Sequence, residues 1–260
     1  MKTPSRKRIT TWFMVSVFLA LACFMVFLLF VISPRLEVSA HIGDPFVSGC
    51  GMTVLDGVVN QGEWSTAATQ SFQMVRSGGG EPFSASLYVM NSATSLYLGI
   101  VINDDEFSTV GTWLPQGDGF RIDFDNDNSG ELFALNDDVL SISAGAPQFF
   151  DEYIYNPDTH STQSDQIAGG TFDGAGTASR VGVLNHFELK HPLCSGDALD
   201  FCLQPGDTVG FRLEYLDAQA NGEFGGSQLF PGSGAASEAD IVIGQCSISE
   251  LLIYLPLLLR

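Results

Sequence analysis

Apolar and polar side chains alternate along several short stretches of this chain. In Gly119–Asp125, for example, Phe120, Ile122 and Phe124 alternate with polar side chains. A period of two residues places one set of side chains on each face of an extended strand. The pattern predicts half-buried β-strands, and it is clearest in Ser95–Asn103, Gly119–Asp125, Asn185–Lys190 and Thr208–Asp217.

Four shorter stretches carry the same signal, namely Ser71–Arg76, Ser84–Asn91, Asp138–Ser143 and Asp240–Gly244. Clusters of Gly, Asn, Asp, Ser and Pro separate them, and no long segment has the periodicity of a helix. Many short strands joined by turns are typical of an all-β fold. We therefore predict an antiparallel two-sheet β-sandwich of the immunoglobulin-like or jelly-roll type over residues 41–246, with roughly nine to eleven strands.

The first 40 residues have the composition of an export signal. A basic segment, Lys2–Arg8, precedes Trp12–Ile32, a run of 21 residues that is almost entirely apolar, and the small residues Val38–Ala40 follow. We expect this run to form a signal helix that is cleaved after Ala40. The alternative is an uncleaved anchor, because about 20 apolar residues can span a bilayer. Either outcome predicts a secreted or cell-surface protein.

The C-terminal segment, residues 247–260, is also apolar. Its run Leu251–Arg260 is ten residues long, which is too short to cross a bilayer as a helix. The segment is interpreted either as a last edge strand or as a sorting or docking tail. Pro256 argues against a central strand, because proline cannot donate to a β-ladder.

The charge of the chain is strongly negative. It has 30 acidic and 11 basic residues, a formal net charge of −19, and five of the basic residues lie in the N-terminal signal. Such a surface repels nucleic acids and anionic membranes and attracts divalent cations. Nucleic acid is therefore excluded as a partner, and a membrane is expected only if the N-terminal run is an uncleaved anchor.

Four cysteines follow the signal: Cys50, Cys194, Cys202 and Cys246. An even number in an exported chain indicates disulfides, and four cysteines allow three pairings. We favour Cys194–Cys202, which closes a short loop, together with Cys50–Cys246, which ties the ends of the domain. A zinc site is the weaker interpretation, because the sequence has no Cys-x-x-Cys and no nearby pair of histidines.

An acidic loop follows the strand Gly119–Asp125. Oxygen-bearing side chains occupy every second position, and Gly130 comes next, as in the first half of a calcium-binding loop. Ligands that are all hard oxygens favour calcium over transition metals. The candidate ligands are Asp125, Asp127, Ser129, Glu131, Asp137 and Asp138. The alternative is a solvated acidic turn.

No motif for catalysis is evident. The sequence has no Gly-x-Ser-x-Gly, no glycine-rich phosphate loop and no His-Glu-x-x-His. A second acidic loop, Asp104–Glu106, reads mainly as a solvated turn, and Asp56 is expected to cap its own turn through its side chain. The protein is therefore predicted not to be an enzyme.

Four motifs in order resemble the family 9-like carbohydrate-binding modules, within the DOMON-like group of β-sandwiches. They are Val54–Gly57 with Gly62–Trp64, then Leu96–Asp105, then Gly117–Asp127, then Phe187–Leu193 with Pro205–Phe211. The resemblance implies an extracellular β-sandwich that binds sugars, often beside calcium, and that is usually attached to enzymes acting on plant polysaccharide. It implies a xylan- or cellulose-like glycan as partner.

In this family a pair of tryptophans typically holds the sugar, and here the candidates are Trp113 and Phe230. Aromatic rings stack on the faces of sugars, and carboxylates accept hydrogen bonds from sugar hydroxyls. The proposed sugar-binding residues are therefore Trp113, Asp118, Tyr153, Tyr155 and Phe230. Trp64 is expected in the core. Two rival interpretations are a calcium-stabilised structural or interaction domain on the cell surface and a haem-binding redox domain. No haem-ligand pair can be assigned.

Overall fold

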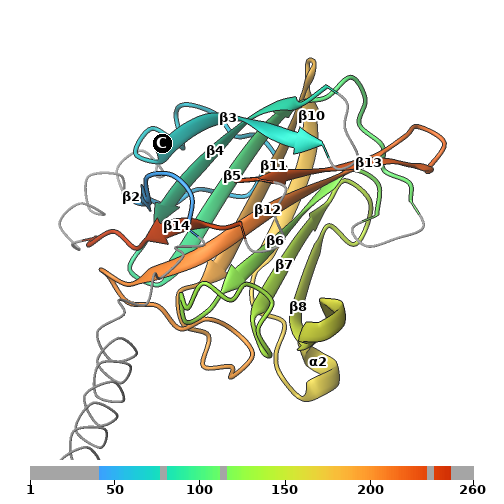
Figure 1. Cartoon of the computed structure of the whole chain (residues 1–260). Helices are drawn as coiled ribbons and strands as arrows, with labels where there is room; N and C mark the ends of the chain where they lie inside the picture. Colours follow the sequence, from blue (N-terminus) through green and yellow to red (C-terminus); the bar gives the residue numbers. More distant parts are fainter. Residues whose placement is uncertain (1–40, 77–80, 112–115, 233–236, 247–260) are drawn as a thin grey trace, which may run out of the picture. The chain divides into compact units, whose positions relative to one another are not determined.

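The computed structural model describes residues 41–76, 81–111, 116–232 and 237–246, and within these ranges the chain forms fourteen strands and two very short helices (Figure 1). The predicted signal segment, the C-terminal tail and Trp113 lie outside the described residues. The strands are β1 (Phe46–Val47), β2 (Gly49–Cys50), β3 (Ala68–Arg76), β4 (Phe83–Asn91), β5 (Ser95–Asn103), β6 (Gly119–Asp125), β7 (Asp138–Ser143), β8 (Phe149–Asn156), β9 (Ser161–Ser164), β10 (Ala175–Val181), β11 (Leu184–Pro192), β12 (Thr208–Ala218), β13 (Phe224–Phe230) and β14 (Ala239–Val242). A 3-10 turn, η1 (Pro157–Thr159), precedes β9, and a single helical turn, α2 (Asp165–Ala168), follows it.

The first sheet has the strand order β10-β11-β5-β4-β3, and β2 adds to it beside β4. The second sheet has the order β13-β12-β6-β7-β8-β9, with β14 beside β12 and β1 beside β14. β3 and β13 share two register pairs, so the sheets join along that edge. The predicted all-β antiparallel sandwich is confirmed. The exceptions are the two-residue strands β1 and β2, which pair in parallel.

The core lies between the sheets and contains the apolar residues of the alternating strands. From the second sheet, Phe120 pairs in register with Tyr215 and Phe124 with Phe211, and all four side chains are fully buried. From the first sheet, Phe187 meets Phe120 edge to face, with ring centroids 5.2 Å apart. Burial of such large apolar side chains is the main stabilising contribution to a fold of this kind.

A buried carboxylate, Glu188 on β11, fastens the N-terminal turn to the first sheet. One of its oxygens accepts the N–H groups of Asp56 and Gly57, at 2.9 and 2.7 Å, and the other accepts the indole N–H of Trp64 at 3.0 Å. Trp64 is 2% exposed, so it is a core residue as expected. Asp56 also accepts the N–H of Val58, which confirms its predicted role in its own turn. The Asp-Gly and Glu-Trp motifs are therefore structural.

Both expected disulfides are present. Cys194 bonds Cys202 across a short loop after β11, and Cys50 bonds Cys246, which joins β2 to the segment after β14. Among the described residues, no helix is long and apolar enough to cross a membrane.

Candidate functional site

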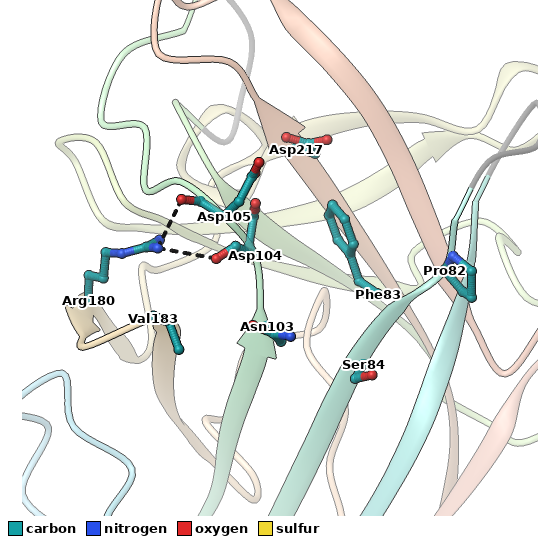
Figure 2. Close-up of a pocket in the computed structure, with 9 residues that line it drawn as sticks. All are labelled: Pro82, Phe83, Ser84, Asn103, Asp104, Asp105, Arg180, Val183 and Asp217. Atoms are coloured by element: carbon teal, nitrogen blue, oxygen red, sulfur yellow. Dashed lines mark hydrogen bonds between the residues drawn. The ribbon is translucent and has the colours of Figure 1, made fainter.

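A cavity of about 710 Å³ opens at one end of the sandwich. Figure 2 shows that its walls come from the start of β4, the end of β5, the turn between β10 and β11, and the end of β12. The residues that line it are Pro82, Phe83, Ser84, Asn103, Asp104, Asp105, Arg180, Val183 and Asp217. Strand ends place a mixed polar and apolar lining around a space large enough for a small ligand.

Carboxylates dominate the polar side of the cavity. Asp104, Asp118 and Asp217 are buried, and each offers an oxygen within 4.8 Å of those of the other two. Asp104 accepts a hydrogen bond from the hydroxyl of Tyr215 at 2.5 Å. Burial is the main cause that raises the pKa of Asp104 above its ordinary value, and it raises the pKa of Asp118 to about 7. Asp118 does not line the cavity, so the carboxylates that a ligand can reach on this wall are those of Asp104, Asp105 and Asp217.

An arginine and an aromatic ring complete the cavity. The guanidinium of Arg180 donates to the carbonyl oxygens of Asp104 and Asp105, at 3.2 and 3.0 Å, and to the side-chain oxygen of Asn185 at 2.7 Å. These bonds hold the end of β5 against the β10–β11 turn. Phe83 is partly buried and lies edge-on to Tyr215, with centroids 5.9 Å apart. In Figure 2 its ring stands opposite Asp104 and Asp105.

Three of the predicted sugar-binding residues are buried, and two of them, Asp118 and Phe230, hold parts of the sandwich together. Asp118 is 0% exposed, and its two oxygens accept the N–H groups of Ser108 and Ala218, so it joins the loop after β5 to the end of β12. Phe230 is 8% exposed and stacks on Phe72 with centroids 3.9 Å apart. Both side chains therefore contribute to the packing of the sandwich.

The two predicted tyrosines lie on β8. Tyr153 is buried, and its hydroxyl donates to the side-chain oxygen of Gln163 on β9. Tyr155 is 48% exposed. Neither tyrosine lines the cavity. Phe83, which does, could not be distinguished from a core residue in the sequence, because it lies at the start of an alternating strand.

A second polar surface lies on the outward face of the second sheet. Asp123 is 1% exposed on this face, and its two oxygens accept the guanidinium groups of Arg121, at 2.7 Å, and Arg212, at 2.9 Å. Both guanidiniums lie over the ring of Phe133. Glu214, which pairs in register with Arg121, is partly exposed. Sequence alternation placed these residues on the solvent side but did not indicate the network.

The predicted calcium loop is held by its own hydrogen bonds. Asp125 accepts the N–H of Gly130 at 2.7 Å and the hydroxyl of Ser129 at 3.4 Å. Asp137 accepts the N–H groups of Asn126 and Ala134. Asp127 and Glu131 are exposed. The pKa of Asp127 is lowered, mainly by its hydrogen bond with the side chain of Ser129. Within the described ranges, three carboxylates of this loop do not converge on one point.

The expected contribution of Asp138 to this loop is wrong. Asp138 is fully buried, and the charges that most affect it are those of Asp151, Asp200 and Asp165, in a separate group. Another carboxylate, that of Glu238, lies beside the loop, and the sequence did not indicate it. Glu238 is 0% exposed, neither of its oxygens has a hydrogen-bond partner, and burial followed by the charge of Asp125 raises its pKa to about 7.

No protein-family model and no curated protein matches this sequence. Solved structures do match the fold. A family 9 carbohydrate-binding module from Caldicellulosiruptor kristjanssonii in complex with cellotriose aligns with a TM-score of 0.55 and 14% identity, over 79% of this chain and 96% of that one. The same kind of module from that organism in complex with glucose aligns with a TM-score of 0.56 and 15% identity, over 79% and 98%. The chain therefore has the β-sandwich fold of the family 9 carbohydrate-binding modules.

Proposed function

We propose that this protein is a non-catalytic, extracytoplasmic domain that binds carbohydrate. The cavity at the end of the sandwich carries the proposal, because its lining combines an aromatic ring with several hydrogen-bonding side chains. Sugars offer both hydroxyl donors and a weakly apolar ring face, and sites of this composition suit them. The two modules with the same fold are complexes with cellotriose and glucose. The two disulfides support the location outside the cytoplasm.

The residues that line the cavity have different roles in sugar binding. Asp105 is exposed at the rim, and Asp104 and Asp217 lie deeper, so they accept hydrogen bonds from sugar hydroxyls. Phe83 packs against the C–H face of the pyranose ring. Arg180 keeps the end of β5 in place through the two carbonyls that it binds, so the carboxylates are oriented before the ligand arrives.

We expect Phe83→Ala to weaken sugar binding roughly tenfold, because an aromatic contact contributes about 1–1.5 kcal/mol. Asp105→Ala is expected to weaken it by a similar factor, because it removes an acceptor without disturbing the core. Calorimetric titration with glucose, cello-oligosaccharides and xylo-oligosaccharides gives the affinities. Phe224→Ala is the matched control, because Phe224 is an exposed phenylalanine that does not line the cavity.

Three further variants locate the sugar-binding site if sugar does not bind in the cavity. Loss of binding in Glu214→Ala alone would move the site to the outward face of the second sheet. Loss in Tyr155→Ala or Trp113→Ala alone would move it to the positions predicted from the sequence. Failure of the unmodified protein to bind any of these sugars would contradict the proposal and favour a structural or interaction domain.

We further propose that the loop from Asp125 to Asp137 binds calcium, with Glu238 as an additional ligand. The support is the alternating oxygen pattern, together with the buried carboxylate of Glu238 beside Asp125, which forms no hydrogen bond and lies 3.5 Å from Nε2 of His41. A Cβ atom built on Gly210 would lie 2.6 Å from an oxygen of Glu238 and 3.1 Å from the Cβ of Asp125, so these two side chains approach across β12. A cation would relieve the repulsion between them.

Calcium is therefore expected to raise the melting temperature relative to EDTA, since a ligand that binds only the folded state stabilises it by about 2.7 kcal/mol at 100 times its Kd. Asp127→Ala is expected to weaken this shift by removing an exposed ligand. Asp207→Ala, in an acidic turn before β12, is the control. A calcium-dependent shift that is identical in Asp127→Ala would rule out this loop as the site.

A further inference from the structure

A second group of carboxylates lies deep in the protein, away from the predicted calcium loop. Asp138 begins β7, Asp151 is on β8, Asp165 begins α2, and Asp200 lies inside the Cys194–Cys202 loop. Their exposed fractions are 0%, 1%, 0% and 6%. Figure 1 shows α2 beside β8 at one end of the sandwich. Segments that are far apart in the sequence therefore bring four acidic side chains together without solvent.

Most oxygens of this group form no hydrogen bond of normal length and angle with the protein. Both oxygens of Asp138, Asp165 and Asp200 and one oxygen of Asp151 are buried without a hydrogen-bond partner. The remaining oxygen of Asp151 accepts the N–H of Asp173. Leaving one buried carboxylate unsatisfied is costly, and four together also repel one another. A cation among these oxygens would replace the protons that burial otherwise retains on Asp138 and Asp165.

A histidine from the end of β11 faces the same point. His191 is 0% exposed, and its Nδ1 lies 2.9 Å from the carbonyl oxygen of Pro192, which only accepts hydrogen bonds. Nδ1 therefore carries the hydrogen, and Nε2 is directed to the group, 3.6 Å from an oxygen of Asp200 and without a hydrogen-bond partner. A ring nitrogen that donates to a carbonyl while the other faces carboxylates is the usual arrangement of a metal-binding histidine.

The ligand atoms converge in two overlapping sets. Those of Asp138, His191 and Asp200 lie within 4.8 Å of one another, and so do those of Asp151, Asp165 and Asp200. Asp200 belongs to both sets and stands at the centre of the group. Burial, followed by the charge of neighbouring carboxylates, raises the pKa of Asp138 and of Asp165, the latter to about 8. This is the environment that a cation neutralises.

We propose that Asp138, Asp151, Asp165, Asp200 and His191 form a binding site for one hard divalent cation. Four carboxylates provide the negative charge and the oxygen ligands that Ca²⁺ and Mn²⁺ prefer, and a single imidazole is compatible with Mn²⁺. The cation ties β7, β8, α2 and the disulfide loop together, so its role is to hold this end of the sandwich. The site is independent of the sugar-binding proposal and shares no residue with the Asp125, Asp127 and Glu238 set.

The test is to strip the purified protein with EDTA and then to add CaCl₂ or MnCl₂ alone. Bound metal is measured by mass spectrometry after removal of free ions, and melting is followed in parallel. We expect Asp138→Asn to bind one ion fewer per chain than the unmodified protein. The control is Asp158→Asn, an exposed aspartate in η1, and it is expected to keep the full metal content.

The melting temperatures separate a metal ligand from a merely structural residue. Without metal, Asp138→Asn is expected to melt no lower than the unmodified protein, because a neutral amide replaces a buried carboxyl group whose ionised form burial disfavours. With metal the order reverses, because only the intact site is stabilised. If Asp138→Asn does not fold, Asp165→Asn at the start of α2 takes its place in both measurements.

Two results would overturn the inference. One is a full metal content in a folded Asp138→Asn or Asp165→Asn protein. The other is binding of ZnCl₂ but neither Ca²⁺ nor Mn²⁺, which would contradict a hard-cation site. Loss of an ion in Asp127→Ala together with full retention in Asp138→Asn would leave calcium in the Asp125 loop and exclude it here.

Discussion

Replacement of both Cys50 and Cys246 by alanine is expected to lower the free energy of unfolding by roughly 5 kcal/mol. The bond joins residues that are 196 positions apart, so it restricts almost the whole unfolded domain. Closing a long loop removes more conformational entropy from the unfolded chain than closing a short one. Urea denaturation of the oxidised protein, followed by circular dichroism, measures the loss.

The second disulfide provides the matched comparison. Cys194 and Cys202 are eight positions apart, and their joint replacement is expected to cost roughly 2–3 kcal/mol by the same relation. An equal loss in the two double variants would contradict the loop-length explanation. Peptide mapping without reducing agent checks the pairing, and free thiols at Cys194 and Cys202 would contradict it.

Trp64→Ala is expected to lower the free energy of unfolding by about 3–5 kcal/mol, as for other buried aromatic side chains. The change leaves a cavity, and it also removes the indole N–H from an oxygen of Glu188 that has no other donor. A buried acceptor without a donor adds to the cost. Chemical denaturation measures the total effect.

Two related variants separate these contributions. Trp64→Phe keeps most of the volume and removes the hydrogen bond, so its cost is expected to lie between zero and that of Trp64→Ala. Gly99→Ala crowds the same ring and leaves both hydrogen-bonding partners in place, because a Cβ atom there would lie 3.0 Å from the indole. If Trp64→Ala folds with unchanged stability and loses sugar affinity, the ring is a binding platform and the core assignment is wrong.

The sandwich itself was predictable because its central strands place their apolar side chains on one face. In a strand such as Gly119–Asp125 the apolar side chains pack against the other sheet and the polar side chains lie on the opposite face, and every segment predicted in this way forms a strand. β10 and β13 were among the strands that were not predicted. Their sequences contain small residues and glycines, so pairing with β11 and β12 rather than alternation determines their conformation.

The acidic residues show the limit of sequence reasoning. Asp137 and Asp138 are neighbours and were assigned to one calcium loop, but successive side chains at the start of a strand point to opposite faces. Asp137 accordingly turns to the loop, and Asp138 turns to Asp151, Asp165 and Asp200.

Residue type and spacing by themselves determined the strand pattern, the even number of cysteines after residue 40 and the excess of negative charge. Only the tertiary structure decided which of the many carboxylates meet. Asp151, Asp165 and Asp200 lie on separate elements, and their oxygens converge because sheet pairing and the Cys194–Cys202 loop bring those elements together. Charge can be counted along a chain, but its burial and its neighbours depend on contacts between residues that are distant in sequence.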